Sequence, residues 1–210
     1  MASLSPCRRP PPRSEIVKPI NPLEILPLTT YDHLRSLLRP LCIAEKSRHR
    51  LAVGQHLTLL FENRQTIWYQ IHEVLRAERI SDNAGIDHEI ETYNELIPRP
   101  GELSATLLIE YVDAVERDTA LARLVGLERH LWLVFDKRRI GVRFDERQIS
   151  PSGISSVQFI AFGLGADAQR FEELAAAGRV EIETDHPHLQ ARAAIGGALA
   201  AALAEDLRPD

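Results

Sequence analysis

Residues 55–98 read QHLTLLFENRQTIWYQIHEVLRAERISDNAGIDHEIETYNELIP, and this run holds the clearest local patterns in the chain. Its first part, Leu57–Phe61, is a short apolar segment that predicts a buried strand. Asn63 can begin a helix, and a helical period then extends over Arg64–Arg79. A second helix is predicted before Pro98, which ends it. The run therefore predicts a strand followed by two helices.

The part of the chain before this run predicts one helical segment behind an extension. Residues 1–27 are rich in proline, arginine and serine and lack the continuous apolar centre of a secretory signal, so we expect a disordered extension. Thr29 and Thr30 can cap a helix that begins near Leu28. Four apolar residues then recur at helical spacing: Tyr31, Leu34, Leu38 and Leu41. Pro40 interrupts this stripe, which predicts a kink or two consecutive short helices.

Beyond Gly101 the sequence becomes richer in strand patterns. The predicted strands are Leu103–Tyr111, Leu131–Phe135, Ile140–Phe144, Val157–Phe162, Val180–Thr184 and Ala191–Ile195. Further helices are predicted from Asp113 to about Gly126, at Asp167–Ala177 and at Ala198–Leu207. This order predicts an α+β fold, with an N-terminal helix-rich part followed by a mixed, largely antiparallel sheet with packed helices. We expect residues 28–210 to form one domain with a weak lobe boundary near residues 150–155.

Composition argues against several classes of protein. The net charge of −5 argues against a general nucleic-acid binder. No apolar run approaches the roughly 20 residues that span a bilayer, so we expect no membrane association. Cys7 and Cys42 are too few to hold an iron–sulfur cluster or a cysteine-based zinc ion by themselves. The pattern suits a reducing compartment, and we expect a cytoplasmic protein.

Three motifs carry a family resemblance. The first extends from Val53 to Arg79, and the second is YNELIP at residues 93–98, preceded by Glu89. The third is LARLVGLE at residues 121–128. Together they resemble a bacterial family called domain of unknown function 3501, and the likeness covers roughly Leu28 to the C terminus.

The resemblance implies a cellular setting and not a reaction. Members of that family are often encoded beside a rubrerythrin-like di-iron protein and an iron–sulfur oxidoreductase subunit. It therefore implies a role in oxidative-stress or electron-transfer metabolism, with those two proteins as partners. It brings no catalytic residues to this chain.

The strongest candidate for chemistry is a polar stripe on the helix at Arg64–Arg79. Its members follow one another at helical spacing over about three turns. The next helix adds polar residues beside its apolar face, so that both helices border one pocket. This candidate pocket for a partner or a small ligand comprises Glu62, Thr66, Gln70, Glu73, Arg76, Glu89, Tyr93 and Asn94.

Carboxylates with a histidine suit iron or manganese, which gives an alternative interpretation as a metal-binding protein or metalloenzyme. The ligands would be drawn from Glu62, Glu73, Glu89, His56 and His72. However, neither helix contains the Glu-x-x-His pattern of di-iron bundles. A third interpretation is structural, with the carboxylates paired to arginines in an ion network. The arginines considered are Arg48, Arg50, Arg64 and Arg76.

Complete enzyme signatures are missing from the sequence. It contains neither a G-x-S-x-G elbow nor a P-loop, and Gly163-x-Gly165 lacks the third glycine of a dinucleotide site. The acid–histidine cluster at residues 185–188, DHPH, is typical of a turn. Together with the redox or oxidative-stress setting that the family resemblance implies, this absence of a complete signature leads us to expect an accessory protein of such a system. It would bind a rubrerythrin-like protein, an iron–sulfur oxidoreductase or a small ligand through residues 55–98.

Overall fold

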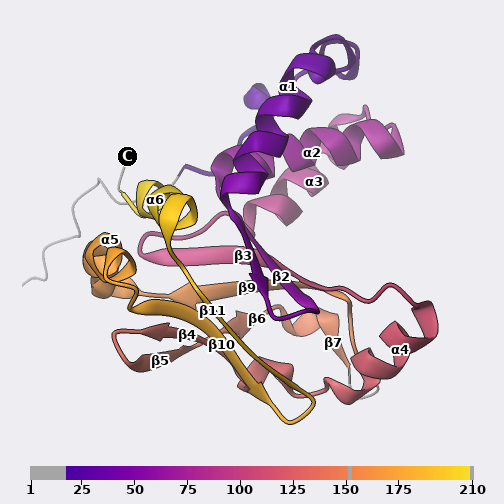
Figure 1. Cartoon of the computed structure of the whole chain (residues 1–210). Coiled ribbons are helices and arrows are strands. Elements are labelled where there is room, and N and C mark those ends of the chain that lie inside the picture. Colours follow the sequence, from indigo (N-terminus) through magenta and orange to yellow (C-terminus); the bar gives the residue numbers. More distant parts are fainter. Residues whose placement is uncertain (1–17, 151–152, 209–210) are drawn as a thin grey trace, which may run out of the picture.

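The computed structural model describes residues 18–150 and 153–208, and within them the chain has an α+β fold. Two facing antiparallel sheets form the body, and a helical arm projects from it (Figure 1). The helices are η1 Pro22–Glu24, α1 Leu28–Arg48, α2 Arg64–Glu78, α3 Asn83–Asn94, α4 Ala114–Arg123, η2 Leu127–Arg129, η3 Glu146–Gln148, η4 Gly165–Arg170, α5 Phe171–Ala176 and α6 Gly197–Asp206. The strands are β1 Arg50–Val53, β2 Leu57–Glu62, β3 Glu102–Ile109, β4 Leu131–Phe135, β5 Arg138–Gly141, β6 Arg143–Phe144, β7 Ile149–Ser150, β8 Gly153–Ile154, β9 Val157–Gly163, β10 Val180–His186 and β11 Leu189–Ala194.

The first sheet has the strand order β1-β2-β3-β9-β6, and each neighbouring pair is antiparallel. Alternation along β2 turns Leu57, Leu59 and Phe61 toward the second sheet and leaves Thr58 and Glu62 on the opposite face. The β1–β2 turn holds Gly54 at φ +67°, where a Cβ atom would lie 2.9 Å from Ala191 Cβ. Glycine therefore allows this hairpin to approach β11 closely.

The second sheet has the order β11-β10-β4-β5, and it faces the first across one apolar core. Strands β4 and β10 turn Leu133, Phe135 and Ile182 into this core, and α5 and α6 close one end of it. Strands β7 and β8 form a separate two-stranded ribbon, and Ile154 of β8 is buried in the same apolar core. The weak boundary expected near residues 150–155 falls beside this ribbon, and residues 151–152 lie outside the described part.

The arm consists of η1, α1, α2 and α3 and has its own apolar core. The buried members of that core are Ile20, Ile67, Ile71, Leu75, Ile90 and Ile97. Residues 18–27 were expected to be disordered, and this was wrong for the described ones, because Ile20 is buried among α2 and α3. The expectation for residues 1–17 lies outside the described residues.

Of the two outcomes predicted at Pro40, the pair of consecutive short helices was wrong. Helix α1 runs without interruption through Pro40. Pro40 removes one backbone donor without ending the helix. Helix α2 begins as predicted, since the Asn63 side chain accepts a hydrogen bond from Thr66 N at 2.9 Å. Of the helices described, none is both long enough and apolar enough to cross a membrane.

Candidate functional site

The polar stripe predicted on α2 divides between two sides of that helix. On one side the Glu62 carboxyl group, which is 4% exposed, accepts hydrogen bonds from two hydroxyls. Thr66 Oγ1 donates at 2.6 Å and Thr106 Oγ1, on β3, donates at 2.8 Å. Hydroxyls and not arginines therefore satisfy this buried acid, and together they join α2 to the outer face of the first sheet.

Gln70 and Tyr93 extend this polar cluster toward α3. Burial raises the pKa of Tyr93, and the nearby Glu89 carboxylate raises it further, whereas the Gln70 side chain acts in the opposite direction. Gln70 Oε1 is buried and has no hydrogen-bond partner among the described residues. The structure thus places Gln70, Glu89 and Glu62 near enough to Tyr93 to act on its hydroxyl.

Glu73 and Arg76 lie on the side of α2 that faces α1. Glu73 accepts hydrogen bonds from Arg35 Nε and Nη2, both at 2.8 Å, and from the Tyr31 hydroxyl at 2.6 Å. The Arg35 hydrogen bonds lower the pKa of Glu73 to about 2. Arg76 Nε pairs with Asp32 Oδ1 at 2.7 Å. These residues hold the two helices together.

Of the carboxylates expected in the ion network, Glu73 pairs with an arginine, and that arginine is not one of the four considered. None of the four arginines considered pairs with a carboxylate of the stripe in the described structure. Their partners are Glu45 and Glu205 for Arg48, Glu110 for Arg50, Glu24 for Arg64 and Asp32 for Arg76. Arg35, on α1, takes the role instead because α1 packs along α2.

Asn94 has a structural contact that the sequence did not indicate. Its Oδ1 accepts from Ile20 N, and its Nδ2 donates to Ile20 O, both at 2.9 Å. The Asn94 side chain thus satisfies both backbone groups of Ile20, as a neighbouring strand would, and it holds the segment before η1 in place. Asn94 faces this segment and not the cluster around Glu62.

The two histidines considered as metal ligands lie in separate parts of the fold. His72 is 1% exposed, accepts from Leu26 N with Nε2 at 3.0 Å and donates from Nδ1 to Trp68 O at 2.8 Å. Burial lowers the pKa of His72, so its ring is neutral and both nitrogens are occupied. His56 stacks on Tyr111, with ring centroids 4.0 Å apart. Within residues 18–150 and 153–208, no three of His, Cys, Asp and Glu are grouped to hold a metal ion.

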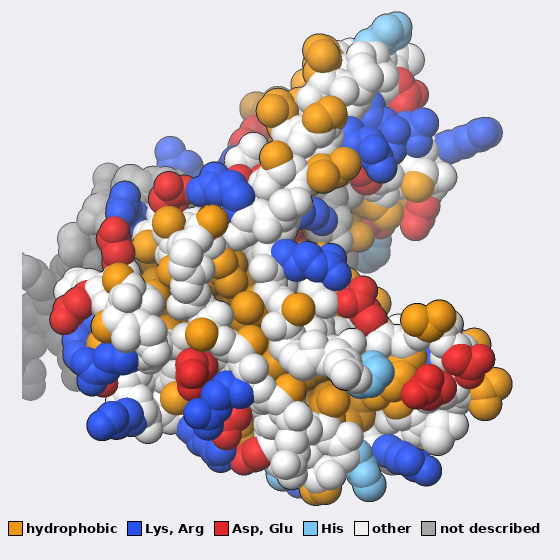
Figure 2. Space-filling view, viewed as in Figure 1, with side chains coloured by type: hydrophobic (Ala, Val, Ile, Leu, Met, Phe, Trp, Pro, Cys, Tyr) orange, Lys and Arg blue, Asp and Glu red, His pale blue; other side chains and the backbone are white. Residues whose placement is uncertain are grey.

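The exposed side of α1 carries an apolar stripe. Leu34, Leu37 and Leu41 are 38, 68 and 63% exposed, and Ala44 continues the same alternating spacing of three and four residues. This spacing is that of the contact positions in a coiled coil. We call these four residues the leucine stripe. Figure 2 shows hydrophobic side chains along the projecting arm.

Two hollows adjoin the arm. A small one of about 50 Å³ lies between α1 and α2, where Leu38 and Leu41 meet Trp68 and Tyr69. A larger one of about 640 Å³ lies between the segment around η1 and the junction of α2 with α3. Its walls are mainly apolar and include Ile25, Leu28, Leu75, Ile80 and Ile86. Both hollows include side chains from residues 55–98.

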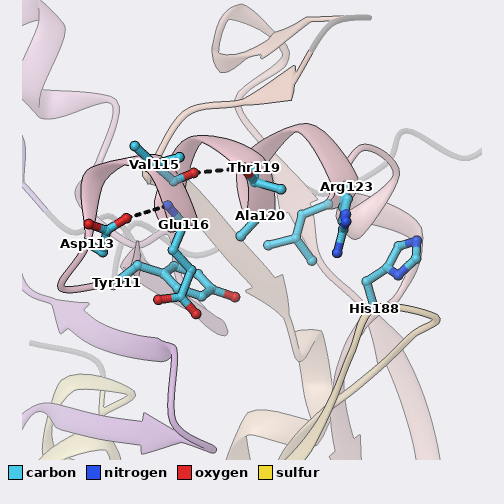
Figure 3. A pocket seen from close by; sticks show the side chains of 9 residues that line it. Tyr111, Asp113, Val115, Glu116, Thr119, Ala120, Arg123 and His188 are labelled. Carbon is cyan, nitrogen blue, oxygen red and sulfur yellow. Dashed lines mark hydrogen bonds between the residues drawn. The ribbon is translucent and has the colours of Figure 1, made fainter.

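A further pocket of about 480 Å³ lies on the body, beneath α4 (Figure 3). Its lining includes Tyr111, Glu116, Arg123 and His188. None of the four residues was predicted from the sequence to line a pocket. The spacing of Glu116 and Arg123, which places both on one face of α4, was the available signal.

Comparison with known proteins gives a family without an activity. A family model described as "Protein of unknown function (DUF3501)" matches residues 19–207. A crystal structure of a novel protein of unknown function from Burkholderia pseudomallei K96243 is similar, with 38% sequence identity and a TM-score of 0.81. The match covers 91% of this chain and 100% of the other. A search of curated proteins gives no match.

Proposed function

The chain belongs to the DUF3501 family of proteins of unknown function, and from this premise we propose that it is an accessory protein that binds a partner protein through its helical arm. The partner belongs to a redox or oxidative-stress system. This setting rests on the genomic neighbours that the family resemblance implies. The arm includes α2 and α3, and so contains the predicted binding region of residues 55–98.

The leucine stripe is the observation that carries the proposal. Leu37 and Leu41 expose most of their side chains on a helix that projects from the body. An exposed apolar row of this kind is more often the contact surface for another protein than a surface that stays exposed to water in a free monomer. A partner helix with the same period would insert its side chains between these leucines. The hollow beside Trp68 and Tyr69 adjoins Leu41 and widens the surface available to that helix.

The polar residues of the predicted pocket support a binding role over a catalytic one. Glu73 is held by Arg35 and Tyr31, and Asn94 is held by the backbone of Ile20. Residues engaged in this way stiffen the arm and present its apolar surface in a fixed shape. The role of the polar stripe is therefore to shape the docking surface.

The metal alternative has less support. It requires Glu62, Glu73 and Glu89 with a histidine around one ion. Glu62 and Glu73 instead bind different partners on opposite sides of α2. His72 Nε2, which would face the ion, already accepts from Leu26 N.

Co-purification tests the proposed function. The tagged full-length protein would be isolated under reducing, anaerobic conditions together with the rubrerythrin-like protein, and separately with the iron–sulfur oxidoreductase subunit. We expect the rubrerythrin-like protein to be retained and to stay bound at physiological ionic strength, since the contact is apolar. Reproducible failure of both proteins to associate would contradict the proposal.

A further inference from the structure

The pocket beneath α4 lies on the body of the protein, away from the arm. It is bordered by α4, by Tyr111 at the end of the first sheet and by His188 in the β10–β11 turn. Its volume of about 480 Å³ is in the usual range for sites of small molecules. Helix α4 buries none of its residues, so side chains of this helix remain available beside the pocket.

Opposite charges stand at the two ends of this pocket. Glu116 and Arg123 are seven residues apart on α4, which places them on the same face and about 10 Å apart along the helix axis. They form no ion pair with each other or with any other described residue. Figure 3 shows Arg123 beside His188 at one end, and Glu116 beside Tyr111 at the other.

The surrounding residues complete each end. The His56 ring stacks on Tyr111 at 4.0 Å and fixes that aromatic wall, and the Tyr111 hydroxyl has no hydrogen bond within the described structure. The His188 ring is tilted at 46° to that of His186, with centroids 5.9 Å apart, and its nitrogens make no hydrogen bond within the described structure. Asp113 is already engaged as the cap of α4, accepting from Glu116 N at 2.8 Å. Ala120 and Leu124 form an apolar stretch between the ends.

The helix dipole does not account for this arrangement. It explains only the order of the two charges, since it favours an acidic residue such as Glu116 in the first turn and a basic residue such as Arg123 in the last turn. It gives no reason for Tyr111 and His188, which come from other elements, to border the same cavity. Most other described arginines have carboxylate partners, as Arg117 on the same helix does with Asp118. Arg123 has its guanidinium beside the cavity instead.

We propose that this pocket binds a small linear zwitterion. The ligand carboxylate lies between Arg123 and His188, and its ammonium group lies against Glu116 and the Tyr111 hydroxyl. A ligand with only a negative charge is disfavoured because it would cover the Glu116 carboxylate without neutralising it, and a ligand with only a positive charge would do the same to Arg123. The apolar stretch at Ala120 and Leu124 accommodates the methylene chain that joins the two charges. Glu116 and Arg123 lie about 10 Å apart along the helix axis, and their side chains reach toward the ligand and shorten the distance that it must span. The two charges of the ligand are therefore separated by several carbon atoms.

Calorimetric titration with 6-aminohexanoate tests this assignment on the full chain. Hexanoate and hexylamine serve as probes with one charge only. We expect saturable binding of 6-aminohexanoate, at least tenfold tighter than of either single-charge probe. We also expect amide NMR shifts at Tyr111, Ala120 and His188.

Variants on α4 locate the site. Arg123→Gln and Glu116→Gln are each expected to weaken 6-aminohexanoate binding at least tenfold. Arg117→Gln, an exposed change on the same helix, is the matched control and should leave affinity within twofold. All three are surface changes, so circular dichroism should show the same fold. Equal binding of hexanoate, no saturable binding of 6-aminohexanoate, or an unaltered affinity in Arg123→Gln would overturn the assignment. Any of these contradicting results would concern the pocket beneath α4 alone and would leave the proposed binding of a partner through the arm unaffected.

Discussion

Arg35 binds Glu73 through two parallel hydrogen bonds, from Nε to Oε1 and from Nη2 to Oε2, each 2.8 Å long. The two residues come from α1 and α2 and lie 38 positions apart in the sequence. Tyr31 adds a third hydrogen bond to the same carboxylate. A bidentate contact of this kind fixes both the distance and the relative orientation of the two side chains. It therefore sets how α1 packs against α2 within the arm.

Replacing this carboxylate should destabilise the protein in a pH-dependent way. Folding lowers the pKa of Glu73 from its usual 4.5 to about 2. The stabilisation is therefore present above about pH 4.5 and is lost as the pH falls toward 2. Glu73→Gln should lower the free energy of unfolding by about 1–2 kcal/mol at neutral pH. Urea unfolding at several pH values checks this, and the difference from the wild type should shrink in acid.

Arg76→Gln is the matched control for Glu73→Gln. Arg76 pairs with Asp32 across the same helices, but both side chains are more exposed. A surface pair of this kind contributes about 0–1 kcal/mol. A larger loss in Arg76→Gln than in Glu73→Gln would show that Arg35 does not hold α1 in place.

His72 should remain neutral well below the usual histidine pKa. Burial lowers its pKa from 6.5, so its contribution to stability is present above about pH 6.5 and is lost as the pH falls further. NMR of the imidazole ring should give a titration midpoint below 6.5. The stability difference between the wild type and His72→Gln should also shrink on acidification, since other histidines contribute equally to both. A midpoint at or above 6.5 would contradict the buried, neutral ring.

Asn94→Ala should loosen the segment around Ile20. The side chain makes two hydrogen bonds to that backbone, and each contributes about 1 kcal/mol. Hydrogen exchange at the Ile20 amide should accelerate, while amides in the two sheets keep their protection. Glu91→Ala, an exposed change on the same helix, should leave the exchange at Ile20 unaltered. The same protection of the Ile20 amide in Asn94→Ala and in the wild type would show that Asn94 does not hold this segment.

Glu62→Gln separates the hydrogen-bonding role of this residue from a metal-binding role. An amide oxygen can still accept from Thr66 or Thr106, so we expect a loss of about 1 kcal/mol. Glu62→Leu should cost more, because both hydroxyls then lose their acceptor. Elemental analysis of protein purified without chelator should give the same iron and manganese content for the wild type and Glu62→Gln. Stoichiometric metal that disappears in Glu62→Gln would establish the metal alternative instead.

Local patterns predicted the elements well where the signals were short in range. The α+β class was confirmed, and Asn63 and the apolar period of α2 placed that helix within about a residue of its observed ends. Pro98 was predicted to end the next helix, but α3 already ends at Asn94. The β4–β5 hairpin was found, but its turn is tighter than expected, with Asp136 and Lys137 at φ 49° and 68°. Asp136 is typical of the first position of such a turn, but Lys137 stands where glycine is usual.

Long-range partners could not be predicted, because spacing along one helix does not identify what covers it. Leu34 and Leu41 share the helical period of Tyr31, yet Tyr31 is buried while both leucines are exposed. Glu73 was recognised as a stripe residue, but Arg35 belongs to a helix whose packing no local pattern fixes. That Arg123 and His188 line the same pocket depends on the position of the β10–β11 turn, which the sequence does not specify.

The affinity of the rubrerythrin-like protein for arm variants tests the central proposal most directly. Leu37→Glu places a charge in the leucine stripe, and Ile43→Glu places the same charge at an exposed apolar position elsewhere on α1, 49% exposed. Six residues at about 100° each turn Ile43 roughly 120° away from Leu37. In a binding titration, Leu37→Glu is predicted to weaken the complex at least tenfold, while Ile43→Glu stays within about twofold of the wild type. Equal affinities for Leu37→Glu and the wild type would contradict docking through the arm.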